Sequence, residues 1–482
     1  MNPFNPKVAR ASLSDLTRIF YKPPRSTPGA LINTPLQRGA TRWQDLRNRF
    51  NGFSRAVRTV ETVSDALRTP NTPLKQGVNE KWWLRSFSRY EISDLRALGF
   101  STLFMAATAF LQVFGTGTDS AGAAEPQFVY FGTYTGQKSK GIYRAQFDPA
   151  TGKLSAAELA AETRNPTFVA VDPKRHFLYA VNEVNDFGKG NFGAVSAFKL
   201  DQKTGDLTFL NQQPSGGGGP CHLAVDPNGR CVLVANYGSG SVAVLPIESD
   251  GRVGEPSCSI QHHGSSVNPQ RQEGPHAHFI TWDPDHRVVL ACDLGLDKVM
   301  LYQLDGARRV LTAHGPPSFA VKPGSGPRHL AFGKNGRYVY ILNEIASTLT
   351  ACSYDRTRGE LQEIQTLSTL PADFAGANTC AEIELHPNGK IVYASNRGHN
   401  SIAVFGIDSG TGKVSLLQHE PTQGKTPRHF MLDPTGHWLL AENQDSDTVV
   451  VFAVDGETGR LTPTGISQPV GAPVCAVFVA KR

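Results

Sequence analysis

The feature that most constrains the fold is an internal repeat of about 50 residues. Each copy holds a short apolar strand, a tight turn and a second apolar strand, as in GPRHLAFGKNGRYVYILNE (326–344) and TPRHFMLDPTGHWLLAENQ (426–444). The turn recurs every 47 to 57 residues, at Asp172, Asp226, Asp283, Gly333, His386 and Asp433. Repeats of this length built from short strands are typical of blades arranged around an axis.

Each repeat continues into two more strands. A third apolar strand follows, such as SVAVLPI (241–247) or SIAVFGI (401–407). A more polar fourth strand follows a Thr-Gly turn, at 151–154, 204–207 and 411–414. Helical periodicity is missing between the repeats, so four short strands per unit predict an all-β propeller.

The two ends of the repeat region complement each other. FVYFGTYTG (128–136) resembles a second strand without its first, and PVCAVFVAK (473–481) resembles a first strand without its second. Pairing them gives seven first strands and seven second strands. Residues 125–482 are therefore predicted to form one seven-bladed β-propeller with four-stranded blades, in which the N- and C-terminal strands close one blade.

Charge is unevenly distributed along the chain. Residues 1–100 hold 17 Lys and Arg against 7 Asp and Glu, whereas the remainder holds 31 basic and 35 acidic residues. A slightly acidic body without a Lys/Arg cluster argues against nucleic acid as a partner. Residues 1–95 are predicted to be a basic extension that is disordered or partly helical.

An apolar segment separates this extension from the repeats. Residues 97–114 (ALGFSTLFMAATAFLQVF) carry no charge and follow Arg96. Ala121 and Ala123 have the spacing that a signal peptidase prefers, so residues 96–124 are predicted to be a secretory signal. The protein would then be periplasmic or extracellular, with the apolar segment as a membrane anchor if uncleaved; otherwise it would be cytoplasmic. Its distance from the first residue leaves open a translation start near Arg96 or a long cytoplasmic extension.

Neither cysteine nor histidine spacing indicates a metal site. Seven Cys residues all follow residue 220 without a C-x-x-C pair, which predicts small buried hydrophobic side chains. The segment 261–278 carries His262, His263, His276 and His278 but no carboxylate or Cys at ligand spacing. We therefore expect no metal and no cofactor. The SGGGGP run at 215–220 is not followed by a helix and is predicted to be a flexible connector.

Equivalent positions in the repeats predict where functional side chains gather. The start of each first strand and the end of the second strand, 16 residues later, should lie at one mouth of the propeller near its axis. These positions hold the pairs Thr167/Glu183, Cys221/Tyr237, His278/Leu294, Arg328/Glu344, Ala381/Arg397 and Arg428/Gln444. The fold does not require residues that change between blades, so these are the candidates for function. Asn or Asp precedes every second member, as Asn343 does, and this repetition favours a structural role.

Three consecutive blades supply the candidate catalytic residues His278, Arg328, Glu344 and Arg397. Two guanidinium groups in one cavity suit an anionic ligand or a developing oxyanion, and a carboxylate with an imidazole can transfer protons. The candidate substrate-binding residues nearby are His276, His329, Asn343, Arg428 and His429. The alternative is that these groups form ion pairs that join neighbouring blades.

Over residues 128–480 the chain resembles the propeller-type lactonase family, which includes bacterial seven-bladed 6-phosphogluconolactonase and fungal carboxy-cis,cis-muconate cyclase. The resemblance rests on YFGTYTG, GPHAHF, GPRHLAF with NGRYVYILNE, SNRGHNSIAVF and TPRHFMLDPTG. It implies a propeller that opens a lactone ring with water and without a metal. It also implies a site made of His278 or His276, Arg328, Glu344 and Arg397. Strand register favours His278.

The resemblance leads us to expect a 6-phosphogluconolactonase-like enzyme that hydrolyses a sugar-derived or anionic lactone to the hydroxy acid. Arg328 and Arg397 would bind the carbonyl or an anionic group, while Glu344 or His278 would activate water and the other would protonate the ring oxygen. A non-catalytic extracytoplasmic ligand-binding propeller and a lactonising muconate-type cycloisomerase are the alternatives. The signal-like segment and the basic extension depart from the family and argue against a phosphorylated substrate more than against lactonase chemistry.

Overall fold

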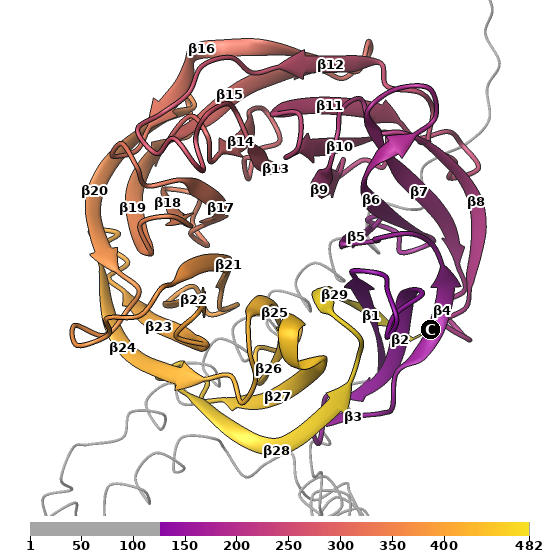
Figure 1. The fold of residues 1–482 in the computed structure, drawn as a ribbon. Helices are drawn as coiled ribbons and strands as arrows, with labels where there is room; N and C mark the ends of the chain where they lie inside the picture. Colours follow the sequence, from indigo (N-terminus) through magenta and orange to yellow (C-terminus); the bar gives the residue numbers. More distant parts are fainter. Residues whose placement is uncertain (1–125, 482) are drawn as a thin grey trace, which may run out of the picture. The chain divides into compact units, whose positions relative to one another are not determined.

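The computed structural model describes residues 126–481, which form seven sheets in a ring around a central axis (Figure 1). The predicted extension (1–95) and signal-like segment (96–124) lie outside the described residues. Helical structure in the described part is limited to one 3-10 turn, η2 (Gln444–Ser446). No helix within residues 126–481 has the length and apolarity needed to cross a bilayer.

Six blades each contain four antiparallel strands that follow one another in the chain, which confirms the predicted four-strand repeat. Blades 1 to 3 consist of β5 (Phe168–Val171), β6 (Phe177–Phe187), β7 (Phe192–Leu200) and β8 (Leu207–Pro214); β9 (Pro220–Val225), β10 (Cys231–Asn236), β11 (Ser241–Pro246) and β12 (Cys258–Gln261); and β13 (Ala277–Trp282), β14 (Val289–Asp293), β15 (Lys298–Asp305) and β16 (Val310–Ala320). Blades 4 to 6 consist of β17 (Pro327–Phe332), β18 (Tyr338–Asn343), β19 (Thr348–Asp355) and β20 (Glu360–Ser368); β21 (Thr379–Leu385), β22 (Ile391–Arg397), β23 (Ser401–Ile407) and β24 (Val414–Pro421); and β25 (Pro427–Leu432), β26 (Trp438–Asn443), β27 (Thr448–Val454) and β28 (Leu461–Pro469).

Blade 7 closes the ring with strands from both ends of the repeat region. Its inner strand is β29 (Pro473–Ala480), which pairs antiparallel with β1 (Gln127–Thr133). Strand β2 (Gly141–Asp148) follows, and its outer edge pairs with β3 (Lys153–Leu154) and β4 (Glu158–Glu162). Figure 1 shows the yellow C-terminal strand beside the indigo β1. The predicted closure is therefore confirmed.

The core lies between neighbouring blades, because both faces of each sheet are buried. In β18, Tyr340 and Leu342 pack against blade 5, whereas Val339 and Ile341 pack against blade 3. Alternating side chains therefore serve two interfaces, which explains why the second strands are apolar at almost every position. Six of the seven Cys residues are buried and Cys258 is partly buried, as predicted.

Tyrosine hydroxyls on second strands tie neighbouring blades together. The hydroxyl donates a hydrogen bond to a glycine carbonyl in the turn before the outer strand of the next blade. The pairs are Tyr130 with Gly205 (2.6 Å), Tyr179 with Gly251 (3.0 Å), Tyr338 with Gly410 (2.7 Å) and Tyr393 with Gly459 (2.8 Å). The repeat therefore places a polar link within each of these apolar interfaces.

The Tyr393→Phe substitution is expected to lower the free energy of unfolding by about 1–2 kcal/mol, because it removes the donor to the Gly459 carbonyl. Tyr340 provides a matched control, since its buried hydroxyl has no partner among the described residues. Tyr340→Phe should leave stability unchanged or raise it. Denaturant titration of the two variants checks this, and equal losses would contradict the role of the inter-blade bond.

The predicted flexible connector at 215–220 is wrong. Ser215 is buried and its hydroxyl donates to the Gly217 carbonyl at 2.8 Å. A Cβ on Gly217 would lie 2.4 Å from the hydroxyl oxygens of Ser239 and Ser241. The glycines therefore allow close packing of the backbone where blade 1 passes into blade 2, and flexibility is not their role.

Candidate active site

The predicted mouth positions line a pocket near the axis. Each first strand runs antiparallel to its second strand, so the start of one and the end of the other share one mouth. There they enclose a cavity of about 280 Å³, lined by Glu183, Cys221, Tyr237, Arg271, His278, Glu344, Thr379, Arg397 and Arg428. Arg328 lies against it and contacts Glu344. The structure thus brings together all four candidate catalytic residues.

A β-bulge in several inner strands presents these side chains. In β13, Ala277 pairs with Asp293 and Phe279 with Cys292, so His278 has no opposite residue. Cys221, Arg328 and Arg428 are skipped in the same way in β9, β17 and β25. A bulge breaks the two-residue alternation of a strand and redirects the extra side chain. The bulged residue reaches the pocket, and the next residue lies beneath it.

Glu344 joins three guanidinium groups at one side of the pocket. Its carboxylate contacts the guanidinium of Arg271, Nε of Arg328 at 3.1 Å and Nη2 of Arg397 at 2.8 Å. Burial alone would raise the pKa of Glu344, but Arg397, Arg328 and Arg271 outweigh burial and lower the pKa from 4.5 to about 2. Glu344 is therefore held ionised and fixes the positions of the arginines.

The imidazole of His278 is the basic group best placed to act on a ligand. Its side chain is buried and is part of the pocket lining. Burial, and then the positive charge of Arg328, hold the pKa of His278 well below its usual 6.5. The ring is therefore neutral at physiological pH and able to accept a proton.

A second polar group occupies the opposite side of the pocket. The Tyr134 hydroxyl donates to Glu183 at 2.8 Å, and the Thr167 hydroxyl donates to the same carboxylate at 2.7 Å. Arg428 donates to the Tyr134 hydroxyl at 3.1 Å and lies over its ring. No carboxylate of the described chain forms an ion pair with Arg428. Its guanidinium is therefore available to an anionic ligand.

The structure separates the other predicted binding residues from the pocket lining. His276 stacks on Tyr237 and hydrogen bonds to Glu273 at the rim. Asn343 donates to Thr348 and Thr350 within its own blade. This agrees with the structural role that the repetition of Asn or Asp at this position favoured. His329 and His429 are buried beneath the pocket against carboxylates. Between His276 and His278, the structure brings His278 to the pocket.

Arg271 is the main pocket residue that sequence reasoning missed. It lies in the loop between β12 and β13, which is longer than the equivalent loops and lies outside the strand register of the repeats. Ser266 anchors this loop through Asp297, and Gln272 anchors it through the Leu294 carbonyl at 2.9 Å. With its side chain 37% exposed, Arg271 forms the solvent edge of the arginine group.

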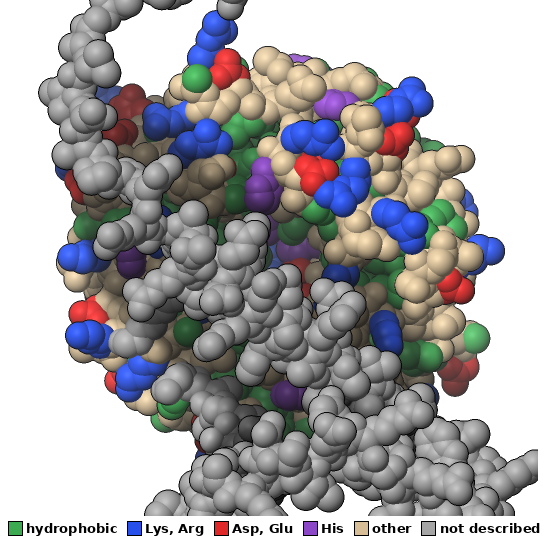
Figure 2. Space-filling view, turned by 180° about the vertical axis from the view of Figure 1, so that it is seen from behind, with side chains coloured by type: hydrophobic (Ala, Val, Ile, Leu, Met, Phe, Trp, Pro, Cys, Tyr) green, Lys and Arg blue, Asp and Glu red, His purple; other side chains and the backbone are tan. Residues whose placement is uncertain are grey.

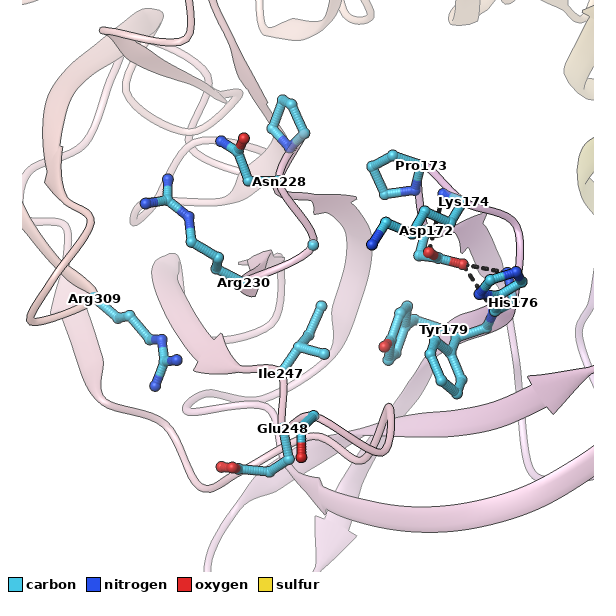
Figure 3. Close-up of a pocket in the computed structure, with 14 residues that line it drawn as sticks. Asp172, Pro173, Lys174, His176, Tyr179, Asn228, Arg230, Ile247, Glu248 and Arg309 are labelled. Carbon is cyan, nitrogen blue, oxygen red and sulfur yellow. Dashed lines mark hydrogen bonds between the residues drawn. The ribbon is translucent and has the colours of Figure 1, made fainter. Parts of the chain in front are cut away.

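A larger cavity of about 660 Å³ lies at the other end of the blades (Figure 3). It is formed by the turns between first and second strands of blades 1 and 2, with Lys174, Arg230 and Arg309 around it. Its buried carboxylate, Asp172, accepts hydrogen bonds from the backbone of its own turn, at 2.6 Å from the amide of His176. Arg230 is paired with Asp226 at 2.7 Å. These groups serve turn formation, so the smaller pocket is the candidate active site.

The histidine-rich loop does not assemble ligands for a metal. His262 contacts Asp293 through Nδ1 at 2.5 Å and Tyr302 through Nε2 at 2.6 Å, which fixes the start of the loop. Across residues 126–481, no group of three or more His, Cys, Asp or Glu side chains has the arrangement of a metal site.

Comparison with known proteins agrees with this geometry. The family model described as "Lactonase, 7-bladed beta-propeller" matches residues 128–478. The 6-phosphogluconolactonase of Bacillus subtilis is 41% identical over 353 residues, which cover 73% of this chain and 97% of that protein. A putative 6-phosphogluconolactonase from Bacteroides fragilis is 35% identical with a TM-score of 0.70, covering 75% of this chain and all of that structure. A periplasmic gluconolactonase from Pseudomonas aeruginosa is 32% identical with a TM-score of 0.70, covering 74% of this chain and all of that structure. The chain belongs to the seven-bladed β-propeller lactonase family.

Proposed function

We propose that the protein hydrolyses a sugar-derived lactone that carries an anionic group, giving the open hydroxy acid. The observation that carries this proposal is the charge of the pocket. Four guanidinium groups, from Arg271, Arg328, Arg397 and Arg428, face two carboxylates, from Glu183 and Glu344. The excess positive charge favours an anionic substrate and stabilises negative charge that develops on a carbonyl oxygen.

His278 acts as the general base in the proposed reaction. A neutral imidazole can take a proton from water as the water attacks the lactone carbonyl carbon, and can return it to the ring oxygen as the ring C–O bond breaks. Arg397, which lines the cavity, and Arg328, which lies against it, stabilise the oxyanion. Burial lowers the pKa of Arg328 to about 10, so its guanidinium stays charged at neutral pH.

Glu344 has a positioning role in this mechanism. A carboxyl with a pKa of about 2 that contacts three guanidinium groups is a weak base and carries no proton to donate at neutral pH. Of the two proton carriers expected from the sequence, His278 therefore takes the acid–base role. Glu344 holds the arginines at the spacing that a lactone carbonyl needs.

A pH-stat assay of the full-length protein tests the proposal, because opening of a lactone releases acid at neutral pH. The panel comprises 6-phosphoglucono-δ-lactone, glucono-δ-lactone and muconate-type dicarboxylic acids. Turnover of the lactones supports the proposal. Turnover of the muconate-type acids alone would favour the cycloisomerase alternative. Binding without turnover of any compound would favour the non-catalytic propeller.

Arg428→Gln is expected to raise KM for 6-phosphoglucono-δ-lactone by about tenfold or more while changing kcat little, because the guanidinium without a carboxylate partner binds the remote anionic group. KM for uncharged glucono-δ-lactone should stay within about twofold of the wild-type value. Steady-state kinetics on both lactones makes the comparison. A similar increase for both substrates would show that Arg428 does not recognise the anion.

The location of the protein and its partners remain proposals. We propose export through the segment 96–124 and a small-molecule lactone as the partner, with membrane contact only through an uncleaved 97–114. On the face visible in Figure 2, Lys and Arg side chains are interspersed with Asp and Glu around the rim, a pattern that does not favour nucleic acid. Cell fractionation with N-terminal sequencing tests export. A mature end near Ala124 or Glu125 would support cleavage, and an intact 1–95 segment would contradict it.

A further inference from the structure

A compact layer of aromatic and titratable side chains lies directly beneath the pocket. It is formed by the residues that follow the bulges, together with their neighbours on the axis. Its members are Phe168, His222, Phe279, His329, Glu382 and His429. The rings of Phe279 and His329 are 4.8 Å apart, and those of Phe168 and His222 are 4.1 Å apart. Four side chains of this layer, those of His222, His329, Glu382 and His429, can titrate.

Two histidines and two glutamates of this region form a connected row. Nδ1 of His329 lies 3.0 Å from one carboxylate oxygen of Glu382. The other oxygen of Glu382 lies 3.7 Å from Nε2 of His429, whose Nδ1 lies 2.8 Å from Glu442. All four side chains are at most 10% exposed. Burial of ionisable groups costs free energy that pairing and hydrogen bonding offset, and a buried cluster of such groups is a candidate functional site.

The row reaches the pocket through His278. The rings of His278 and His329 are 5.2 Å apart in an edge-to-face arrangement. Nδ1 of His278 and Nε2 of His329 are both buried, and neither has a hydrogen-bond partner in the described chain. Fully buried polar atoms without partners are rare and require an explanation. The two rings are not hydrogen bonded to each other, so a proton passes between these two nitrogens only through a bridging water.

Of the two carboxyls in the row, Glu382 is the one that lies next to both histidines. Burial raises the pKa of Glu382, but His429 and Arg328 partly offset it. Burial together with neighbouring carboxyls raises the pKa of Glu442 and of Glu384 well above 4.5. The other titratable groups that face the row are His222, which lies against His329, and Cys475, which lies near Glu382 and Glu442.

We propose that His329 and Glu382, supported by His429 and Glu442, form a buried proton acceptor that acts through His278 during lactone hydrolysis. This inference rests on the proposed function. As water adds to the carbonyl carbon, Nε2 of His278 takes its proton, and Nδ1 of His278 releases its own proton through a bridging water to Nε2 of His329. His329 releases its own Nδ1 proton to Glu382, which leaves both imidazoles neutral and Glu382 protonated. When the ring C–O bond breaks, the proton returns to the ring oxygen, and the row regains its starting state.

Glu382→Gln in the full-length protein tests this proposal. The variant keeps the shape of the side chain but removes the acceptor. We expect kcat on 6-phosphoglucono-δ-lactone to fall by about tenfold or more with KM unchanged. The acid limb of the kcat profile should move to lower pH, because loss of the negative charge lowers the pKa of His278. A purely structural residue would not shift this limb.

Glu384→Gln is the matched control. Glu384 lies two residues away in β21, is partly buried, and accepts a backbone hydrogen bond from Leu432 at 2.7 Å without contacting an imidazole. This variant should keep kcat within about twofold and leave the profile in place. A Glu382→Gln variant with the wild-type profile would overturn the proposal, as would an equal shift in both variants.

His329→Gln provides a second test should thermal melting show that Glu382→Gln does not fold. Gln has no imidazole ring, so it cannot accept a proton at one nitrogen while releasing one from another. We therefore expect kcat to fall again by about tenfold or more at constant KM. A wild-type kcat in this variant would overturn the proton acceptor. Failure of the wild-type protein to open any lactone would instead overturn the proposed function, which keeps the two outcomes distinct.

Discussion

Replacement of His278 by Gln is expected to lower kcat for lactone hydrolysis by about 10²–10⁴-fold, with a much smaller change in KM. Gln retains a polar side chain of similar size but cannot accept a proton from water. Since burial and Arg328 keep the imidazole neutral, the wild-type ring is ready to act as a base across the neutral range. Steady-state kinetics by pH-stat on 6-phosphoglucono-δ-lactone, together with a melting curve to confirm folding, makes the measurement.

His276→Gln is the natural control for this experiment. His276 lies two residues before His278 in the same GPHAH segment, but it stacks on the outer side of Tyr237 and contacts Glu273 at the rim. We expect its kcat to stay within about threefold of the wild-type value. If His276→Gln were inactive and His278→Gln active, this would contradict the assignment of His278. The general base would then be His276, at the rim of the pocket.

The ring and the position of the site could be predicted because both follow from the repeat. Seven copies of one strand pattern fix the number of blades, and the complementary ends fix the closure of β29 on β1. Once equivalent positions are aligned, any residue at the start of a first strand must face the same mouth. That geometry placed His278, Glu344 and Arg397 in one pocket without knowledge of any contact.

The details of the site could not be predicted because they depend on departures from the repeat. Strand alternation predicts that Arg328 and His329 point to opposite faces, whereas the bulge in β17 directs both towards the axis. Arg271 comes from a loop that is longer than its equivalents in other blades and lies outside the shared strand register. The sequence suggested that Glu344 could transfer protons, whereas the proposed mechanism gives it a positioning role. The reason is that its pKa depends on three guanidinium groups that only the folded chain brings to it.

Glu344→Gln is expected to lower kcat/KM by about 10²–10³-fold. Gln has nearly the same shape as Glu, so the loss would come from the missing negative charge. Arg271, Arg328 and Arg397 would lose their shared counter-ion, repel one another and leave the positions that stabilise the oxyanion. Glu273→Gln serves as the control, because Glu273 carries the same charge in the same region but is 59% exposed and pairs only with His276. Near wild-type activity in Glu344→Gln would contradict the positioning role.

The same variant should change how stability depends on pH. A carboxyl whose pKa is lower in the folded chain than in the unfolded chain adds stability above the unfolded value and loses it as the pH falls towards the folded value. For Glu344 these limits are 4.5 and about 2, a difference worth about 3 kcal/mol. Denaturant titrations should therefore show the wild-type protein well above the variant at pH 6, with the gap narrowing steadily below pH 4.5. Parallel curves down to pH 3 would mean that Glu344 is not held ionised, and the arginines would then need another counter-ion to remain together in so small a pocket.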